Sequence, residues 1–233
     1  MANATNYSYF PAMTTLTNAP LAPVLDRLFA QADASTALLR QEMANISAED
    51  RQKMMTSTTE YRAFYERAKD FPLAVSRATG TLLYMLARSS AARTIVEFGT
   101  SFGISTLHLA AALRDNGGGR LITTEFEPSK VARARENLTA GGVIDLVEIR
   151  VGDALETLRN NLPESIELLL LDGHKALYLD ILSLVESRLR PGTLVVADNA
   201  DFNPEYVARM RSPANGYLST PFGSDVELSL RIG

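Results

Sequence analysis

Cysteine is absent from the 233 residues, which excludes disulfides, thiolate catalysis and cysteine metal sites. Basic residues are not in excess: 23 Lys and Arg stand against 27 Asp and Glu, and the resulting acidic balance argues against a general nucleic-acid binder. No apolar run approaches the roughly 20 residues that span a bilayer. Residues 1–8 lack the basic start and apolar core of a signal peptide. These absences predict a cytoplasmic protein with no nucleic-acid and no membrane partner.

The chain is organised around residues 94–107, where an apolar run leads through a turn with Gly99 and Gly103 into a helix-forming segment. This order predicts a strand, a tight loop and a helix start, the first unit of a doubly wound, Rossmann-like α/β sheet with helices on both faces. Four later apolar segments also each run into an acidic residue and predict further strands. A terminal hairpin is expected after them. The later strands are expected over 121–125, 146–151, 166–171, 193–197, 217–222 and 226–232.

The residues before this unit predict an N-terminal helical extension. Residues 1–20 show no periodicity and predict an irregular arm, whereas apolar residues at spacings of three and four predict a helix over 21–43. Further helices are expected over 47–69 and over 72–89, the latter with Pro72 at its first position. These helices would flank the sheet and supply substrate contacts. Together with the arm they are compatible with a homodimer.

Acidic residues stand at the ends of the expected strands, where open parallel sheets bind their ligands. A dinucleotide favours a G-x-G-x-x-G turn for its pyrophosphate, whereas S-adenosylmethionine presents a positive sulfonium and ammonium. The loop here has only two glycines and Glu97 precedes it, which favours S-adenosylmethionine. Glu125 is expected to bind ribose hydroxyls in either case, and Asp153 to accept a hydrogen bond from adenine. A single acidic residue at a strand end is more often a solvated surface residue than a ligand-binding one. Five such residues in succession beside a glycine loop favour a binding site.

A second group of polar residues follows the fourth and fifth expected strands. If these strands are neighbours, Asp172, Asp198 and the amide oxygen of Asn199 converge, and three oxygen ligands suit a hard cation such as Mg²⁺. Lys175 is then placed to take a proton from a bound hydroxyl or to stabilise the resulting oxyanion. The alternative is that Asp198 and Asn199 only turn the chain and that Lys175 is a solvated lysine, and the sequence leaves this alternative open. His174 has no role fixed by the pattern.

At this point the sequence resembles the class I S-adenosylmethionine-dependent O-methyltransferases of the catechol and caffeoyl-CoA type. The resemblance covers residues 71–233, and residues 1–70 form the arm and helical cap outside it. It rests on five segments, of which the last two are the more specific. These are 96–105 (VEFGTSFGIS), 124–128 (TEFEP), 151–154 (VGDA), 171–178 (LDGHKALY) and 197–199 (ADN).

The resemblance implies a fold and a set of site residues. It implies a seven-stranded sheet whose last strand is antiparallel. The methionine end of S-adenosylmethionine would lie against Glu97, Gly99, Ser101 and Ser105. Its ribose and adenine would contact Glu125, Phe126, Asp153 and Ala154. Asp172, Asp198 and Asn199 would bind a divalent cation, which is expected to be Mg²⁺. Lys175 would be the catalytic base.

The sequence therefore predicts an enzyme that transfers a methyl group from S-adenosylmethionine to a hydroxyl of a small aromatic substrate of the catechol type. Three alternatives stay open. The first is a metal-independent methyltransferase on the same fold, and the second is a nicotinamide-dependent oxidoreductase. The third is a non-catalytic binding module. The residue after Gly173 is often acidic in bacterial and plant members of the family, whereas it is His174 here. No motif in the sequence identifies the methyl acceptor.

Overall fold

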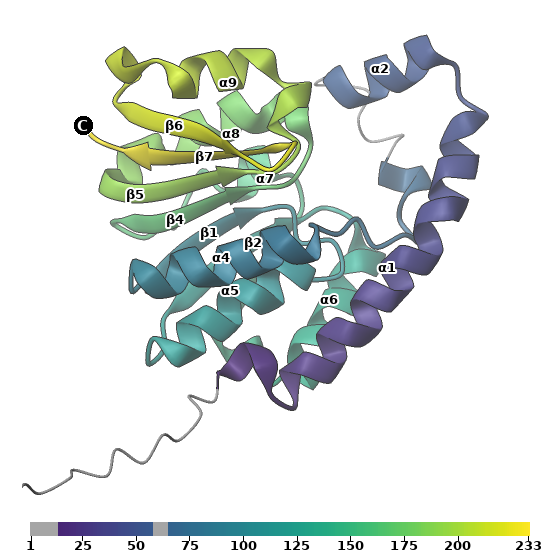
Figure 1. The fold of residues 1–233 in the computed structure, drawn as a ribbon, viewed down its shortest axis with the longest axis horizontal. Coiled ribbons are helices and arrows are strands. Elements are labelled where there is room, and N and C mark those ends of the chain that lie inside the picture. The colour runs from purple at the N-terminus through teal and green to yellow at the C-terminus, as the bar shows by residue number, and fades with distance from the viewer. Residues whose placement is uncertain (1–13, 58–64) are drawn as a thin grey trace, which may run out of the picture.

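The computed structural model describes residues 14–57 and 65–233. Its strands are β1 (Thr94–Phe98), β2 (Arg120–Glu125), β3 (Val147–Val151), β4 (Ile166–Leu171), β5 (Leu189–Ala197), β6 (Tyr217–Phe222) and β7 (Val226–Arg231). Within the described residues these seven strands form one sheet in the order β3-β2-β1-β4-β5-β7-β6 (Figure 1). β7 is antiparallel to β5 and β6, and the other neighbouring pairs are parallel. The predicted fold class is confirmed.

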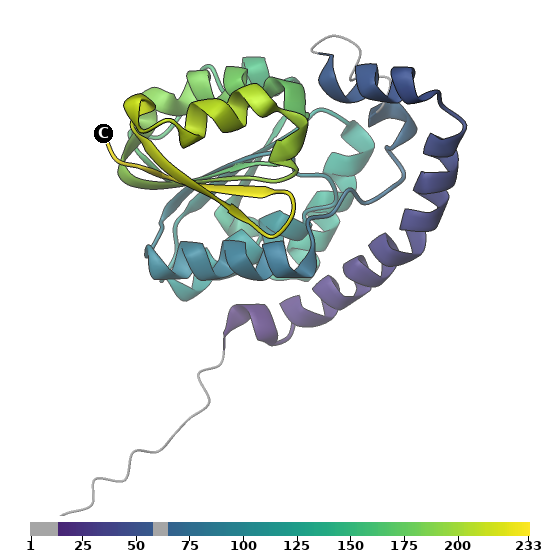
Figure 2. The same cartoon turned by 45° about the horizontal axis from the view of Figure 1, so that its top comes forward.

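Helices cover both faces of this sheet. They are α1 (Leu21–Ala44), α2 (Ala48–Thr56), α4 (Arg77–Ser89), α5 (Ile104–Asp115), α6 (Pro128–Ala140), α7 (Ala154–Thr157), α8 (Tyr178–Val185) and α9 (Pro204–Arg211). The first core cluster joins α4, α5 and α6 to one face, and the second joins α7, α8 and α9 to the other (Figure 2). The N-terminal half of α1 packs in the first cluster, and the rest of α1 leads away from it to α2 (Figure 1).

β4 lies at the centre of the sheet, and its composition explains why. β1 and β5 flank it, and both of its faces are covered by helices. A strand in that position buries every side chain, so its sequence is a continuous apolar run instead of an alternating one. Leu168, Leu169, Leu170 and Leu171 accordingly have no exposed surface.

α4 and α5 pack closely because a glycine faces a histidine ring. A Cβ added at Gly80 would lie 2.7 Å from the imidazole of His108, so only glycine leaves room for that ring. The ring nitrogen Nδ1 of His108 lies 2.8 Å from the Ile104 carbonyl, one turn earlier in α5. His108 is 4 % exposed. It is therefore a packing residue of the core.

Two of the predicted N-terminal helices have different bounds in the structure. The helix expected over 72–89 begins only at Arg77, and Pro72 precedes it in a segment without regular secondary structure. Ser76 caps this helix by accepting a 3.0 Å hydrogen bond from the backbone N–H of Thr79, an N-cap that the pattern missed. Of the helix expected over 47–69, residues 48–56 form α2, Ser57 is extended and residues 65–67 are again helical, while residues 58–64 lie outside the described residues.

The remaining N-terminal predictions have mixed outcomes. Residues 1–13 of the expected arm lie outside the described residues, and Thr15–Thr17 forms a 3₁₀ turn. Thr15 is tied to α5, because its hydroxyl donates a 2.5 Å hydrogen bond to the Asp115 carboxylate. The division of the chain between residues 70 and 71 stays a prediction. Among the described residues no helix combines the length and apolarity needed to cross a membrane.

Candidate functional site

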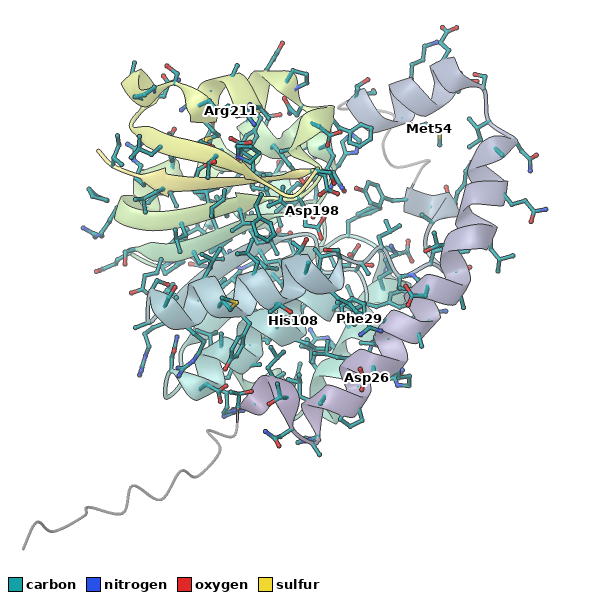
Figure 3. All side chains as sticks on the ribbon, viewed as in Figure 1. Asp26, Phe29, Met54, His108, Asp198 and Arg211 are labelled. Carbon is teal, nitrogen blue, oxygen red and sulfur yellow. The ribbon has the colours of Figure 1, made fainter. Side chains whose placement is uncertain are left out.

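The carboxyl ends of β1, β4 and β5 meet at one edge of the sheet. The backbone ladder continues one step beyond the strands: Asp172 N–H donates to the Phe98 carbonyl (2.8 Å) and Asp198 N–H donates to the Leu171 carbonyl (2.9 Å). Neighbouring strands lie about 4.8 Å apart, so Asp172 and Asp198 stand side by side, as the sequence predicted. Figure 3 shows Asp198 at this edge, toward the side on which α1 carries Phe29.

A cavity of about 440 Å³, here called the loop cavity, lies between the β1–α5 loop and the ends of β2, β3 and β4. Its lining is partly backbone, and it extends from the glycine loop to the start of α7. Six residues that the sequence assigned to cofactor binding line it: Gly99, Ser101, Glu125, Phe126, Asp153 and Ala154.

The glycine loop passes directly beside the end of β4. A Cβ at Gly99 would lie 2.6 Å from the carbonyl oxygen of Asp172, and the φ of Gly99 is +104°, which favours glycine. Ser101 extends the contact on the other side, because its hydroxyl accepts a 3.1 Å hydrogen bond from the backbone N–H of Leu73. The loop is thus fixed from both sides, and its backbone forms one wall of the loop cavity.

Glu125 is held at the tip of β2 by backbone donors. Its Oε2 accepts from Ser101 N–H (2.9 Å) and its Oε1 accepts from Glu127 N–H (3.0 Å). Burial raises the pKa of Glu125, while these N–H groups and the charge of Lys130 oppose the rise. Each carboxylate oxygen keeps a further lone pair, so the carboxylate can still accept two hydroxyl hydrogen bonds from a ligand in the loop cavity.

Glu97 and Ser105, which the resemblance placed at the methionine end of the cofactor, are buried behind the loop in the structure. Neither lines the loop cavity. The Ser105 hydroxyl donates to Oε1 of Glu97 (2.5 Å) and the Thr106 hydroxyl donates to Oε2 (2.6 Å), which anchors the first turn of α5 to β1. Burial raises the pKa of Glu97 to about 7, although both hydroxyls oppose the rise. Their predicted contact with a cofactor stays a prediction.

A second cavity of about 490 Å³, here called the Asp198 cavity, lies on the other side of Asp172. It contains the whole predicted metal group, Asp172, Asp198 and Asn199, together with Lys175. The structure therefore brings these residues together. α1, the irregular segment before α4 and the start of α4 complete the lining with Phe29, Ala32, Asp33, Thr36, Pro72, Ala74, Val75, Ser76 and Arg77. Asp172, Tyr65 and Leu73 line both cavities, so the two adjoin.

Asp172, Asp198 and Lys175 form a buried charged group. Burial and the charge of Asp172 raise the pKa of Asp198 to about 8. Burial also raises the pKa of Asp172, although Lys175 lies 3.0 Å from its Oδ1 and opposes the rise. Burial lowers the pKa of Lys175, but the charges of Asp172 and Asp198 outweigh it, so the pKa lies above its usual value. With its pKa at about 8, Asp198 holds a proton at neutral pH, and a divalent cation bound to Asp172 and Asp198 would replace that proton.

The chemistry of the donor set fits a hard divalent cation. Asn199 donates its amide nitrogen to Oδ2 of Asp225 (3.2 Å), which leaves its amide oxygen available as a ligand. Residues 14–57 and 65–233 contain no cluster of three or more histidine, aspartate and glutamate side chains suited to a metal. A cation here would therefore depend on Asp172, Asp198 and the amide oxygen of Asn199, oxygen donors of the kind Mg²⁺ prefers.

For three residues of the loop cavity, no pattern in the sequence predicted a role in the site. Tyr65 packs edge-on against Phe126 and His174, with ring centroids 5.7 and 6.0 Å away. His174 is neutral because burial lowers its pKa to about 4, and its Nε2 lies 2.9 Å from the Ser57 carbonyl. Lys130, in the first turn of α6, is 1 % exposed and lines the cavity near Glu125. Their positions depend on tertiary packing, which no spacing rule encodes.

Residues 96–200 match the family model for a methyltransferase domain. These residues are therefore similar to a methyltransferase domain over a little less than half of the chain. A curated catechol O-methyltransferase of Niastella koreensis is 37% identical over 130 residues, which are 54% of this chain and 58% of that protein. Catechol O-methyltransferase B of Danio rerio is 30% identical over 169 residues, 69% of this chain and 63% of that protein. The resemblance stated from the sequence is thereby confirmed, although the chain spans less than two thirds of these relatives' lengths.

Solved structures agree with the assignment of the methyltransferase domain. The O-methyltransferase TomG of Streptomyces achromogenes, solved with S-adenosylmethionine, is 28% identical and has a TM-score of 0.63. The match covers 87% of this chain and 99% of TomG. An O-methyltransferase of Bacillus cereus, solved with S-adenosylhomocysteine, has a TM-score of 0.62 at 24% identity and supports the fold alone.

Proposed function

We propose that this protein transfers a methyl group from S-adenosylmethionine to a hydroxyl of a small aromatic substrate, preferably one of a vicinal pair. The observation that carries the proposal is the junction at Asp172 between the loop cavity and the Asp198 cavity. A donor in the first and an acceptor in the second would meet there. The catechol O-methyltransferases among the relatives support this class of acceptor.

In this proposal the loop cavity holds S-adenosylmethionine, which supplies a methyl group on a positive sulfur. Glu125 binds the ribose hydroxyls, because its carboxylate is already oriented by two backbone N–H groups. Asp153 and Phe126 contact the adenine. Gly99 and Ser101 lie beside the methionine end, and the carboxylate of Asp172 attracts its positive charge. The cavity of about 440 Å³ is within the usual range for small-molecule sites.

Asp172, Asp198 and Asn199 would hold a divalent cation, Mg²⁺ in the first place. Such an ion lowers the pKa of a hydroxyl bound to it and neutralises the negative charge that develops. The protein's own part is to keep three oxygen donors at one wall of the Asp198 cavity. Phe29 on the α1 side of that cavity offers an apolar surface for an aromatic ring.

Lys175 is the proposed catalytic residue. Its pKa lies above the usual value, so at neutral pH it is an ammonium and stabilises the ionised acceptor oxygen by charge. Acting as the base, as the sequence predicted, requires that the Asp172 carboxylate no longer faces the ammonium. The acceptor hydroxyl gives up its proton to solvent, or to Lys175 where that residue is neutral. Its oxygen then attacks the methyl carbon in line: a C–O bond forms, the C–S bond breaks, and sulfur keeps the electron pair. Positioning and electrostatics supply most of the catalysis.

The test is a methyl-transfer assay on a panel of catechols, with EDTA and with Mg²⁺ restored. The proposal expects O-methylated product that disappears with EDTA and returns with Mg²⁺. Product that persists with EDTA would favour the metal-independent methyltransferase and remove the cation. Absence of methylated catechol under every condition would reject the acceptor class. A parallel titration with nicotinamide dinucleotides tests the oxidoreductase, for which the proposal expects no binding in the loop cavity.

A further inference from the structure

The turn between β6 and β7 lies against the turn that carries Asn199. β7 pairs antiparallel with β5, with Ala197 opposite Glu227. Two residues further on, this register brings Asp225 opposite Asn199. The contact has two parts: Ala200 N–H donates to the backbone carbonyl of Asp225 (2.8 Å), and the amide nitrogen of Asn199 donates to Oδ2 of Asp225 (3.2 Å).

The side-chain contact determines which way the Asn199 amide points. A carboxylate only accepts hydrogen bonds, so it pairs with the amide nitrogen and repels the amide oxygen. The oxygen therefore lies at the end of the amide that does not face Asp225. The backbone of Asn199 is fixed as well, with φ at +49° in the left-handed region. Asp225 is half-buried and does not line the Asp198 cavity, so it contacts the Asn199 amide from outside that cavity.

We infer that Asp225 is a positioning residue that holds the amide oxygen of Asn199 toward the Asp198 cavity as a metal ligand. The inference rests on the proposed function, because it needs the cation site at Asp172, Asp198 and Asn199. It goes beyond that function by assigning a role to the β6–β7 turn, which no motif indicated. Without the carboxylate, the amide is free to present its nitrogen, which cannot bind a cation.

A charge effect is the competing explanation, because Asp225 adds a third carboxylate near Asp198. Its charge contributes to the raised pKa of Asp198, after burial and the charge of Asp172, while the charge of Lys175 opposes the rise. Two substitutions separate orientation from charge. Asp225→Ala removes both the charge and the acceptor, whereas Asp225→Asn removes the charge but keeps an acceptor oxygen for the Asn199 amide. Both keep the backbone hydrogen bond to Ala200.

The experiment is a Mn²⁺ titration followed by electron paramagnetic resonance, without S-adenosylmethionine or acceptor. Partners that orient a metal ligand typically contribute 10–100-fold in affinity, so Asp225→Ala is expected to weaken Mn²⁺ binding about tenfold or more. Asp225→Asn is expected to recover most of that loss. Thr220→Ala, an exposed change in β6 of the same hairpin, is the matched control and is expected to bind like the wild type. Thermal unfolding of each variant checks that the fold is kept.

Each other outcome has a definite meaning. Equal losses in Asp225→Ala and Asp225→Asn would assign the effect to charge and overturn the inference. Unchanged affinity in Asp225→Ala would overturn it as well. Absence of Mn²⁺ binding in the wild type would remove the cation site, and the inference with it. Titration of the same samples with S-adenosylmethionine tests the methyl-donor site independently.

Discussion

Glu97 gives the sharpest quantitative prediction, because a buried carboxyl with a raised pKa couples folding to pH. The perturbation is Glu97→Gln, which keeps the shape of the side chain and removes its titration. In the wild type the pKa rises from 4.5 in the unfolded chain to about 7 in the folded protein. The folded state therefore binds a proton that the unfolded state has lost, across the window from pH 4.5 to pH 7.

This pH range determines both the sign and the size of the change in the free energy of unfolding. A raised carboxyl pKa contributes stability that is fully present below the unfolded pKa of 4.5 and is lost as the pH rises through the folded pKa of about 7. Each pKa unit corresponds to about 1.36 kcal/mol, so the wild type loses roughly 3 kcal/mol that Glu97→Gln does not lose. The substitution also alters the hydrogen bonds with Ser105 and Thr106, but that effect does not depend on pH.

The assay is urea unfolding of both proteins at a series of pH values from 5 to 8. The stability of Glu97→Gln relative to the wild type is expected to increase by roughly 3 kcal/mol over this range. Glu164→Gln, which removes an exposed carboxylate, controls for the loss of one negative charge. A difference between wild type and Glu97→Gln that stays constant with pH would refute the reasoning and would mean that Glu97 is ionised throughout.

Three further predictions concern the two cavities. Lys175→Ala is expected to lower kcat by about 10²–10⁴-fold while isothermal titration shows unchanged S-adenosylmethionine affinity; a parallel loss of affinity would make Lys175 a structural residue. Lys130→Met removes a charge that lowers the pKa of Glu125, so S-adenosylmethionine binding is expected to weaken more at pH 6 than at pH 8; equal weakening at both values would contradict this. Gly99→Ala forces a Cβ to 2.6 Å from the Asp172 carbonyl oxygen, so urea unfolding is expected to show a loss of about 1–3 kcal/mol; an unchanged unfolding free energy would mean that the loop moves freely.

The sheet was predictable from sequence because its strands are short apolar runs with clear ends. The bounds of β4 and β6 agree with the prediction residue for residue, since glycine, proline and acidic residues flank them. The grouping of Asp172 with Asp198 was predictable for the same reason: both follow parallel strands directly. The prediction needed only that β4 and β5 be neighbours, and they are.

The errors occur where tertiary contacts override local pattern. Pro72 suggested a helix start, but the N–H of Leu73 donates to Ser101 in the glycine loop, and the segment has no regular structure until Ser76 caps α4. That the hydroxyls of Ser105 and Thr106 enclose the Glu97 carboxylate was also not predictable from spacing, because it depends on how α5 packs against β1. The roles assigned to the site residues, the cation and the homodimer stay predictions.

The most direct test of the central claim is a crystal structure of the protein with S-adenosylhomocysteine and Mg²⁺. The account predicts that the ribose lies against Glu125 and the sulfur at the Asp172 junction, with Mg²⁺ on Asp172, Asp198 and the amide oxygen of Asn199. Nucleoside density in the Asp198 cavity, or a metal bound away from these three residues, would contradict it.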